Sequence, residues 1–414
     1  MPRKISFIII GILTLIAIGI FVAAFIIAPR EDKTPVEVLR DFIPFGGGGA
    51  DEPVRRPPQS DPSQDGDGLE DGPLAGQAGE GNALLQLSST PVVGASFHRI
   101  GEDEKEHLTV RYVEQTTGNI FEVNPETLEK VRLTNTTLLA LKRVLWSDDE
   151  KRLLVQYLDG EVIKTFMGNI VGGESGVGSL EGEFLEENIE ALTLSPERDK
   201  VFSLRSFGDI VIGTILNIKN GDKEQVFAHP FKEWLVGWPT ENQIILTTKP
   251  SNGVLGQSIL LTLSNERIVP LLNNIPGLTT QPSFDGRNIL YGEMRGQTLS
   301  RIISYNRESG NSLVFPLATL PEKCVWSRVS PQRAFCAVPQ APEKALYPDD
   351  WYRGVVSFSD EIWQLDVERG SVSQVTQESL NNSFDVINLE LDVEERFLLF
   401  QNKKDGTLWR LKLE

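Results

Sequence analysis

The chain has 414 residues, 40% of them hydrophobic and 24% charged, and a formal net charge of −18 at pH 7. This hydrophobic content supports a sizeable core. The acidic excess argues against nucleic-acid binding, because such a surface needs clustered Lys and Arg to neutralise phosphates. Two cysteines exclude a scaffold of several disulfides, and three widely spaced histidines give no zinc-ligand pattern. No phosphate-binding loop or dinucleotide fingerprint is present, so no cofactor is predicted.

The first apolar segment of the chain runs from Ile5 to Ile27 without a charge. A helix of this length crosses the hydrocarbon core of a bilayer. A cleaved signal peptide has a shorter apolar stretch and a small-x-small cleavage site, which Phe25-Ile26-Ile27-Ala28-Pro29 does not provide. Residues 1–30 are therefore predicted to be a cytoplasmic N-terminus and a single transmembrane anchor in contact with the lipid bilayer.

The charges that flank this segment predict its orientation. Arg3 and Lys4 precede the apolar run, whereas Glu31 and Asp32 lie between Arg30 and Lys33 after it. The positive-inside tendency then places the N-terminus in the cytoplasm and the rest of the chain on the extracytoplasmic side of the cytoplasmic membrane.

Residues 31–82 differ sharply in composition from the segments on either side. They combine prolines, the Gly46–Gly49 run and an excess of acids, and cannot bury enough apolar surface to offset the entropy of ordering. A disordered linker is predicted. Within it, Asp65, Asp67 and Asp71 resemble the closely spaced carboxylates of a calcium-binding repeat. A plain acidic linker explains the same residues, and the choice stays open.

From Ala83 to Glu414 a unit recurs in which an apolar strand, a polar turn and a second β-rich strand follow one another. Successive copies are 44 to 49 residues apart, except for a last step of 62 residues. The equivalent positions are Phe97, Trp146, Leu194, Trp238, Pro282, Val329 and Leu391. Steps of about 40–50 residues with several short strands are typical of four-stranded propeller blades. An all-β, seven-bladed propeller is predicted for residues 83–414.

The two ends of the repeat region predict how the ring closes. The last unit stops after its third strand, at Leu411-Lys412-Leu413-Glu414. Before the first unit, the stretch from Leu85 to Val92 resembles the outer strand and connection from Val131 to Leu138. The N-terminal strand is therefore expected to complete the last blade, which removes an exposed strand edge.

These units resemble the TolB-like (WD-type) propeller repeats of bacterial envelope proteins, whose blades carry a Ser-Pro-Asp-Gly type of turn before an apolar strand. Only Asp285-Gly286 keeps the turn glycine; Pro196-Glu197-Arg198-Asp199 lacks it. The resemblance implies a propeller at the cell envelope and says little about activity, because propellers serve as binding modules, scaffolds and enzymes.

Cys324 and Cys336 flank one of the predicted turns. On adjacent antiparallel strands they can lie opposite one another and form a disulfide in an oxidising compartment. Two buried free thiols are the alternative.

The long last step contains an insertion, residues 339–358. Its central residues are typical anchors of a protein interface: Tyr347, Asp349, Asp350, Trp351, Tyr352 and Arg353. The alternative is that Trp351 and Tyr352 pack the insertion onto its own blade.

The sequence thus predicts a membrane-tethered scaffold that binds an envelope protein, a cell-surface polymer or another ligand. Since no catalytic motif was found, the chain is predicted not to be an enzyme. The alternative function is a glycan-active hydrolase or lyase that uses carboxylates around the central channel.

Overall fold

The computed structural model describes residues 83–101, 107–148, 151–172, 176–375 and 384–413. The predicted anchor, the linker and its candidate calcium ligands Asp65, Asp67 and Asp71 lie outside these residues. No helix among the described residues is long and apolar enough to span a membrane.

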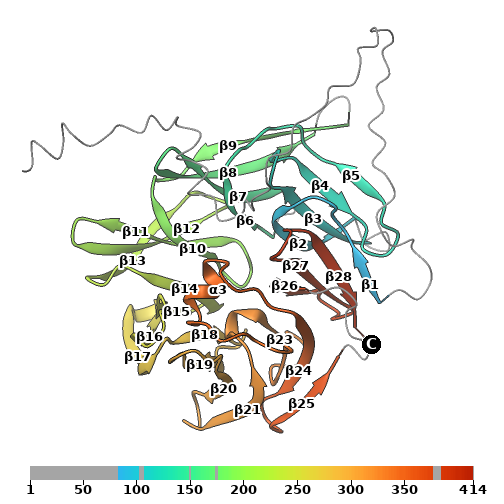
Figure 1. Ribbon diagram of the computed structural model, residues 1–414. Coiled ribbons are helices and arrows are strands. Elements are labelled where there is room, and N and C mark those ends of the chain that lie inside the picture. The colour runs from blue at the N-terminus through green and yellow to red at the C-terminus, as the bar shows by residue number, and fades with distance from the viewer. Residues whose placement is uncertain (1–82, 102–106, 149–150, 173–175, 376–383, 414) are drawn as a thin grey trace, which may run out of the picture. The chain divides into compact units, whose positions relative to one another are not determined.

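Within the described residues, seven antiparallel sheets of four strands surround one axis, as Figure 1 shows. The prediction of a seven-bladed propeller is confirmed.

Each blade is numbered in chain order, and its strands are given from the inside outward. Blade 1 contains β2 (Val92–Ile100), β3 (His107–Glu114), β4 (Ile120–Val123) and β5 (Lys130–Arg132). Blade 2 contains β6 (Leu141–Trp146), β7 (Arg152–Asp159), β8 (Val162–Val171) and β9 (Ser179–Phe184). Blade 3 contains β10 (Ile189–Leu194), β11 (Lys200–Phe207), β12 (Ile210–Asn217) and β13 (Lys223–His229). Blade 4 contains β14 (Trp234–Thr240), β15 (Gln243–Thr248), β16 (Leu255–Thr262) and β17 (Arg267–Pro276).

The remaining three blades follow the same pattern. Blade 5 contains β18 (Thr279–Pro282), β19 (Asn288–Gly292), β20 (Arg301–Asn306) and β21 (Ser312–Ala318). Blade 6 contains β22 (Cys324–Trp326), β23 (Arg333–Pro339), β24 (Asp360–Asp366) and β25 (Ser371–Gln374). Blade 7 contains β26 (Val386–Leu391), β27 (Phe397–Asn402), β28 (Leu408–Lys412) and, outermost, β1 (Leu84–Gln86). The described helices are short: η2 (Leu263–Asn265), η3 (Pro321–Lys323) and α3 (Asp349–Tyr352).

Ring closure occurs in blade 7. Strand β1 pairs antiparallel with β28, with Leu84 opposite Leu411 and Gln86 opposite Trp409. The prediction that the N-terminal strand completes the last blade is therefore confirmed. The chain then enters blade 1 through Leu87, which is fully buried.

The core lies between the blades rather than in one central mass. A cluster of buried apolar residues fills each of the seven junctions between neighbouring blades, including the junction of blade 7 with blade 1. Trp146, Trp238 and Trp326 are buried in three of these clusters, as expected for aromatic residues between blades. Because each strand presents one side chain face to each neighbouring blade, nearly continuous apolar strands such as β19 and β23 are buried throughout.

The ring has two faces that carry different polar groups. We call the face that bears the turns between the first and second strands of each blade the turn face. The opposite face bears the loops between second and third strands and the connections between blades. We call it the cap face, because the insertion between β23 and β24, with α3, lies on it (Figure 1).

Candidate functional site

The insertion on the cap face is packed against the ring. Tyr347 and Trp351 are 0% and 4% exposed, and both rings stack on Phe358. They form one apolar cluster with Met294 and Leu320, which belong to blade 5 and to its connection with blade 6. Tyr347 and Trp351 therefore hold the insertion to the propeller, whereas the alternative interpretation named Trp351 and Tyr352 and expected packing on the insertion's own blade.

The two aspartates of α3 also make internal contacts. Asp349 accepts hydrogen bonds from the Ser251 hydroxyl at 2.8 Å and from the Asn252 backbone amide at 2.7 Å, both in blade 4. Asp350 accepts a hydrogen bond from the backbone amide of Leu346. The loop of blade 4 and the insertion of blade 6 are thereby joined across blade 5.

The last two predicted interface residues remain accessible. Tyr352 is 44% exposed and donates its hydroxyl to Glu322, and the Arg353 side chain is 64% exposed beside Asp350. Of the six residues predicted to bind a partner, these two present the most side-chain surface. Partner binding itself stays a prediction.

Cys324 and Cys336 lie directly opposite one another in β22 and β23 and form a disulfide. Their sulfur atoms are 2.08 Å apart and their Cα atoms 4.0 Å apart. The sequence left this bond and two free thiols as equal alternatives, and the structure contains the bond.

On the turn face, Arg198 connects three blades that are distant in sequence. It lies in the turn between β10 and β11, and its guanidinium donates to Ser96 of β2 at 2.7 Å and to Glu390 of β26 at 2.8 Å. Ser96 also donates to the same Glu390 oxygen at 2.8 Å. Because β2, β10 and β26 are the innermost strands of blades 1, 3 and 7, this side chain reaches across the axis.

The backbone of Arg198 has an unusual conformation for a residue with a side chain. Its φ is 52°, in the left-handed region that favours glycine. In the equivalent turn of blade 5, Gly286 takes this position with a φ of 68°. Residues held in this region at a cost in free energy often lie at functional sites. In blade 7, Glu395 takes the same position with a φ of 57°, so two turns depart from the Asp-Gly pattern, and the one in blade 3 directs an arginine to the axis.

A second arginine of the turn face forms no ion pair with a described residue. The Arg328 guanidinium lies 3.9 Å from the ring centroid of Phe284, and within the described residues it makes no ion pair or hydrogen bond. The Arg328 side chain keeps access to solvent, yet its pKa is lowered, first by desolvation and then by the charge of Arg198, against the opposing charges of Glu390 and Glu197. An acidic protein therefore carries two neighbouring guanidinium groups here, one of which forms no ion pair with a described residue.

Two groups beside these arginines have unused lone pairs. Glu390 uses Oε1 for Ser96 and Arg198, and its Oε2 accepts no hydrogen bond within the described residues. His98 is 6% exposed, packs edge-on against Trp146, and its Nε2 has no hydrogen-bond partner among the described residues. Burial, then the charges of Arg111 and Arg198, lower the pKa of His98 to about 3, so the imidazole is neutral at physiological pH.

Comparison with known proteins identifies the fold of this chain but does not place it in a family. No family model matches the chain, and no curated protein matches its sequence. Among solved structures, an oligogalacturonate lyase in complex with manganese has a TM-score of 0.50 and 10% identity over 78% of this chain and 98% of its own. A Vibrio parahaemolyticus oligogalacturonate lyase has a TM-score of 0.49 and 12% identity over the same shares. At these identities the likeness shows the propeller fold alone.

The first of these comparisons corrects one prediction. The chain was predicted not to be an enzyme because its sequence lacks a catalytic motif, and that prediction is wrong: a solved protein with this fold is a lyase. The absence of a linear motif does not exclude catalysis, because propeller blades bring residues of distant segments to one axis. Neither solved structure is a TolB-like protein, and the resemblance to that family stays a prediction.

The described residues do not fit a metal of the kind that the first lyase binds. They contain no group of three His, Cys, Asp or Glu side chains able to hold a metal ion. The groups gathered around Arg198 on the turn face include two guanidinium groups, the Glu390 carboxylate, an imidazole and a hydroxyl.

Proposed function

We propose that this propeller is a lyase that acts on an anionic carbohydrate at the turn face. The observation that carries the proposal is the exposed Arg328 guanidinium, which lies on Phe284 near Arg198 and forms no ion pair or hydrogen bond with a described residue. A guanidinium binds a carboxylate through two parallel hydrogen bonds, which suits the acid group of a uronate sugar. The fold shared with an oligogalacturonate lyase supports the same substrate class by analogy.

The proposed chemistry is an elimination. Arg328 and Arg198 bind the substrate carboxylate and offset the negative charge that develops on it when the neighbouring carbon loses its proton. Glu390 Oε2, which accepts no hydrogen bond from a described residue, takes that proton as general base. A carbon–carbon double bond forms as the glycosidic carbon–oxygen bond breaks, and the departing oxygen takes a proton from water.

An elimination fits these groups better than a hydrolysis. A retaining or inverting glycosidase needs two carboxyl groups at a set separation across the bond that breaks. At the turn face, the carboxylate of Glu390 faces two arginines and a serine. One base together with guanidinium groups for the carboxylate is the set that an elimination requires.

The test uses the full chain in detergent with polygalacturonate and shorter oligogalacturonides. Elimination creates an unsaturated uronide, whose ultraviolet absorbance reports turnover, and titration calorimetry reports binding. Glu390→Gln should bind without turnover, and Arg328→Ala should lose binding. Arg287→Ala, an exposed arginine of the same face that pairs with Glu308, is the matched control. The proposal fails if a panel of acidic oligosaccharides is neither bound nor cleaved.

We further propose that the propeller is tethered outside the cytoplasm by residues 5–27. The linker of 52 residues from Glu31 to Asn82 gives a reach of ~40 Å by the scaling of flexible chains. The disulfide of Cys324 with Cys336 suits an oxidising compartment. Protease added to intact cells should cleave in the linker and release the propeller; full protection in intact cells and cleavage only after lysis would contradict this orientation.

A scaffold role is a second candidate, favoured by apolar side chains on the insertion. Leu346, Tyr352 and Val355 are 43%, 44% and 68% exposed on the cap face. Clustered exposed apolar residues are typical of protein interfaces. Crosslinking in membranes, followed by co-purification with wild-type and Val355→Asp chains, tests this role: a specific partner should be lost from the variant.

A further inference from the structure

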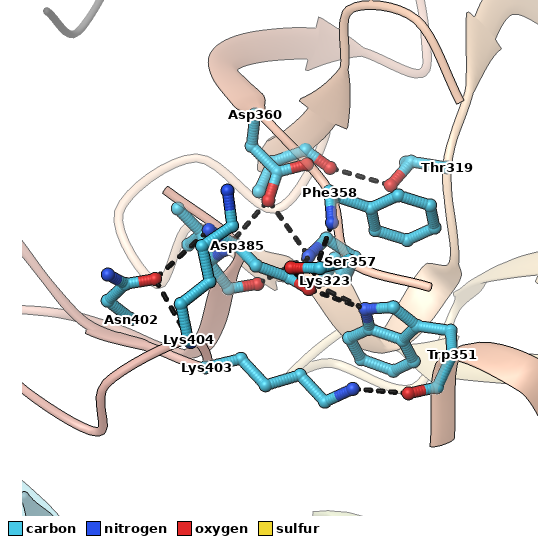
Figure 2. Close-up of polar contacts among 12 residues, drawn as sticks. Thr319, Lys323, Trp351, Ser357, Phe358, Asp360, Asp385, Asn402, Lys403 and Lys404 are labelled. Atoms are coloured by element: carbon cyan, nitrogen blue, oxygen red, sulfur yellow. Dashed lines mark hydrogen bonds and ion pairs between the residues drawn. The ribbon is translucent and has the colours of Figure 1, made fainter. Parts of the chain in front are cut away.

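Three ionisable side chains meet under the insertion, as Figure 2 shows. Lys323 ends η3, Asp360 begins β24 and Asp385 precedes β26. Lys323 Nζ lies 2.9 Å from Asp360 Oδ2 and 2.7 Å from Asp385 Oδ1, and all three side chains are 0% exposed. A lysine is almost never fully buried unless it is paired, so this cluster needs a physical explanation.

The surroundings exclude water from these charges. The rings of Trp351 and Phe358 stack on one another, and Lys323 Nζ lies 4.9 Å and 5.0 Å from their centroids. Burying an ion pair in such an environment costs several kcal/mol per ion before the mutual attraction offsets it. A neutral product of the same groups avoids this cost.

The two aspartates are held differently. Asp385 accepts hydrogen bonds from Trp351 Nε1, the Ser357 hydroxyl and the Phe358 backbone amide, in addition to Lys323. Burial by itself raises the pKa of Asp385, but the charge of Lys323 and these donors outweigh it, so its pKa lies below the ordinary value. Asp385 is therefore a stable carboxylate.

Asp360 has fewer donors. Its Oδ2 accepts a hydrogen bond from the Val386 backbone amide at 2.7 Å and contacts Lys323, whereas its Oδ1 is buried without a hydrogen-bond partner in the described part of the chain. Burial raises the pKa of Asp360 to about 6, against the opposing effect of Lys323. The Asp360 carboxyl is thus readily protonated, and a protonated carboxyl is open to attack by an amine in a way that a carboxylate is not.

We propose that Lys323 and Asp360 condense to form an intramolecular isopeptide bond, with Asp385 as the proton acceptor. Asp385 takes a proton from the Lys323 ammonium, and the free amine attacks Cγ of the protonated Asp360. The nitrogen–carbon bond forms, Asp385 passes its proton to Oδ1, and the bond from Cγ to Oδ1 breaks so that Oδ1 leaves as water. The nitrogen then gives its second proton to Asp385, which ends as a neutral carboxylic acid. An amine and a carboxylic acid give an amide and one water, without an oxidant or other reactant.

Most hydrogen bonds of the site survive this reaction; the bond from Lys323 Nζ to the Val386 carbonyl oxygen at 2.7 Å is lost, because the amide nitrogen keeps one hydrogen. Oδ2 of Asp360 becomes the amide oxygen and still accepts the Val386 amide, and the new amide N–H points from the former Nζ toward Asp385 Oδ1. The oxygen that departs is the one that has no partner. Two buried charges disappear, and Asp385 keeps its donors from Trp351, Ser357 and Phe358.

The bond would close a loop around blade 6. Residues 323 to 360 include both strands of the Cys324–Cys336 disulfide and the whole insertion with α3. A crosslink of this kind restricts the unfolded chain and fixes the base of the insertion to the ring.

The decisive measurement is the intact mass of the denatured, reduced full chain. The expected result is a mass lower by one water than the sequence requires, and a proteolytic map in which the peptides that contain Lys323 and Asp360 are joined. An aspartate that cyclises elsewhere in the chain also loses one water, and the joined peptide distinguishes the isopeptide bond from it. A full sequence mass with trypsin cleavage after Lys323 overturns the proposal and leaves an ion cluster.

Variants test the roles of the side chains. Lys323→Arg keeps the positive charge but should show the full mass, and Asp385→Asn should lose or slow the condensation because no acceptor for the proton remains. Lys403→Arg is the matched control: Lys403 also faces the Trp351 ring, at 4.4 Å, and should keep the mass deficit. A deficit that persists in Lys323→Arg would overturn the assignment of the bond, whether or not the other variants fold.

Discussion

Arg198 and Gly286 occupy the same position in the first turns of blades 3 and 5, with φ angles of 52° and 68°. In both turns this residue donates its backbone amide at 2.9 Å to the carbonyl oxygen of the serine that begins the turn, Ser195 or Ser283. One position is satisfied by a glycine without strain and the other by an arginine that contacts Ser96 and Glu390. The left-handed conformation of Arg198 costs free energy, and its side chain makes contacts that a glycine at this position lacks.

This relationship predicts that Arg198→Gly weakens the binding of acidic oligosaccharides but hardly changes the free energy of unfolding. Removing the side chain relieves backbone strain of about 1 kcal/mol, and it loses a partly exposed ion pair worth roughly 0–1 kcal/mol. The free energy of unfolding, measured by denaturant titration, should change by less than about 1 kcal/mol. Binding of acidic oligosaccharides should weaken at least tenfold.

The reverse exchange is its control. Gly286→Ala places a side chain in the left-handed region, where its Cβ would lie 3.0 Å from Gln243 Oε1. It should lower the free energy of unfolding by about 1 kcal/mol or more. If Arg198→Gly is the more damaging variant for stability, the Arg198 side chain is primarily structural and the strain argument is wrong.

Ring closure by β1 makes a second prediction. A chain that begins at Ala83 should fold as a soluble propeller, whereas a chain that begins at Ser88 leaves the β28 edge unpaired and should aggregate. Leu87→Ala, at a fully buried position, should lower the free energy of unfolding by about 2–5 kcal/mol. Val131→Ala, on the outer strand β5 and 56% exposed, is the matched control and should have an effect within about 0.5 kcal/mol. Light scattering and denaturant titration measure both; equal behaviour of the two truncated chains would refute closure.

The disulfide makes a third prediction. Reduction of Cys324 and Cys336 should lower the free energy of unfolding by about 2–4 kcal/mol, because the bond restricts the unfolded chain. Denaturant titration with and without reductant measures the difference. A chain with both cysteines changed to alanine should be insensitive to reductant. Two titratable thiols in the protein isolated without reductant would contradict the bond.

The sequence was sufficient to predict the fold because propeller blades repeat. Apolar strands and polar turns recur in every blade, the spacing is 44 to 49 residues except for the last step of 62, and the missing outer strand of the last unit matched the extra strand before the first. These patterns depend on the order of apolar and polar residues within each unit and on the repeat length, and both can be read from one sequence. The opposed positions of Cys324 and Cys336 followed from the turn between them, although the register that joins them did not.

The two polar clusters were invisible in the sequence for a physical reason. Ser96, Arg198 and Glu390 are separated by 102 and 192 positions, and only closure of the ring brings them to one axis. Lys323 follows Glu322 directly and Asp385 stands between Phe384 and Val386, and nothing in either local sequence distinguishes a buried charge from an exposed one. The one indication of the turn-face site in the sequence was the loss of the turn glycine at Arg198. This loss shows a departure from the repeat, but it does not by itself identify a site.

His98 makes the last prediction, because its folded and unfolded pKa values differ. Burial, then Arg111 and Arg198, lower its pKa from 6.5 to about 3 in the folded protein. Between these values the unfolded chain binds more protons than the folded one, so the free energy of unfolding rises with pH across this window. The contribution is complete above pH 6.5 and is lost as the pH falls toward 3.

The His98→Gln variant should remove this dependence, since glutamine does not titrate. Between about pH 4.5 and 6.5 the free energy of unfolding should fall on acidification by on the order of a few kcal/mol in the wild-type chain, and by clearly less in the variant. Denaturant titrations at matched ionic strength compare the two slopes, and carboxylates shared by both chains cancel in the comparison. Parallel slopes would mean that the imidazole titrates alike in both states, and therefore that Arg198 and the surrounding blades do not desolvate it.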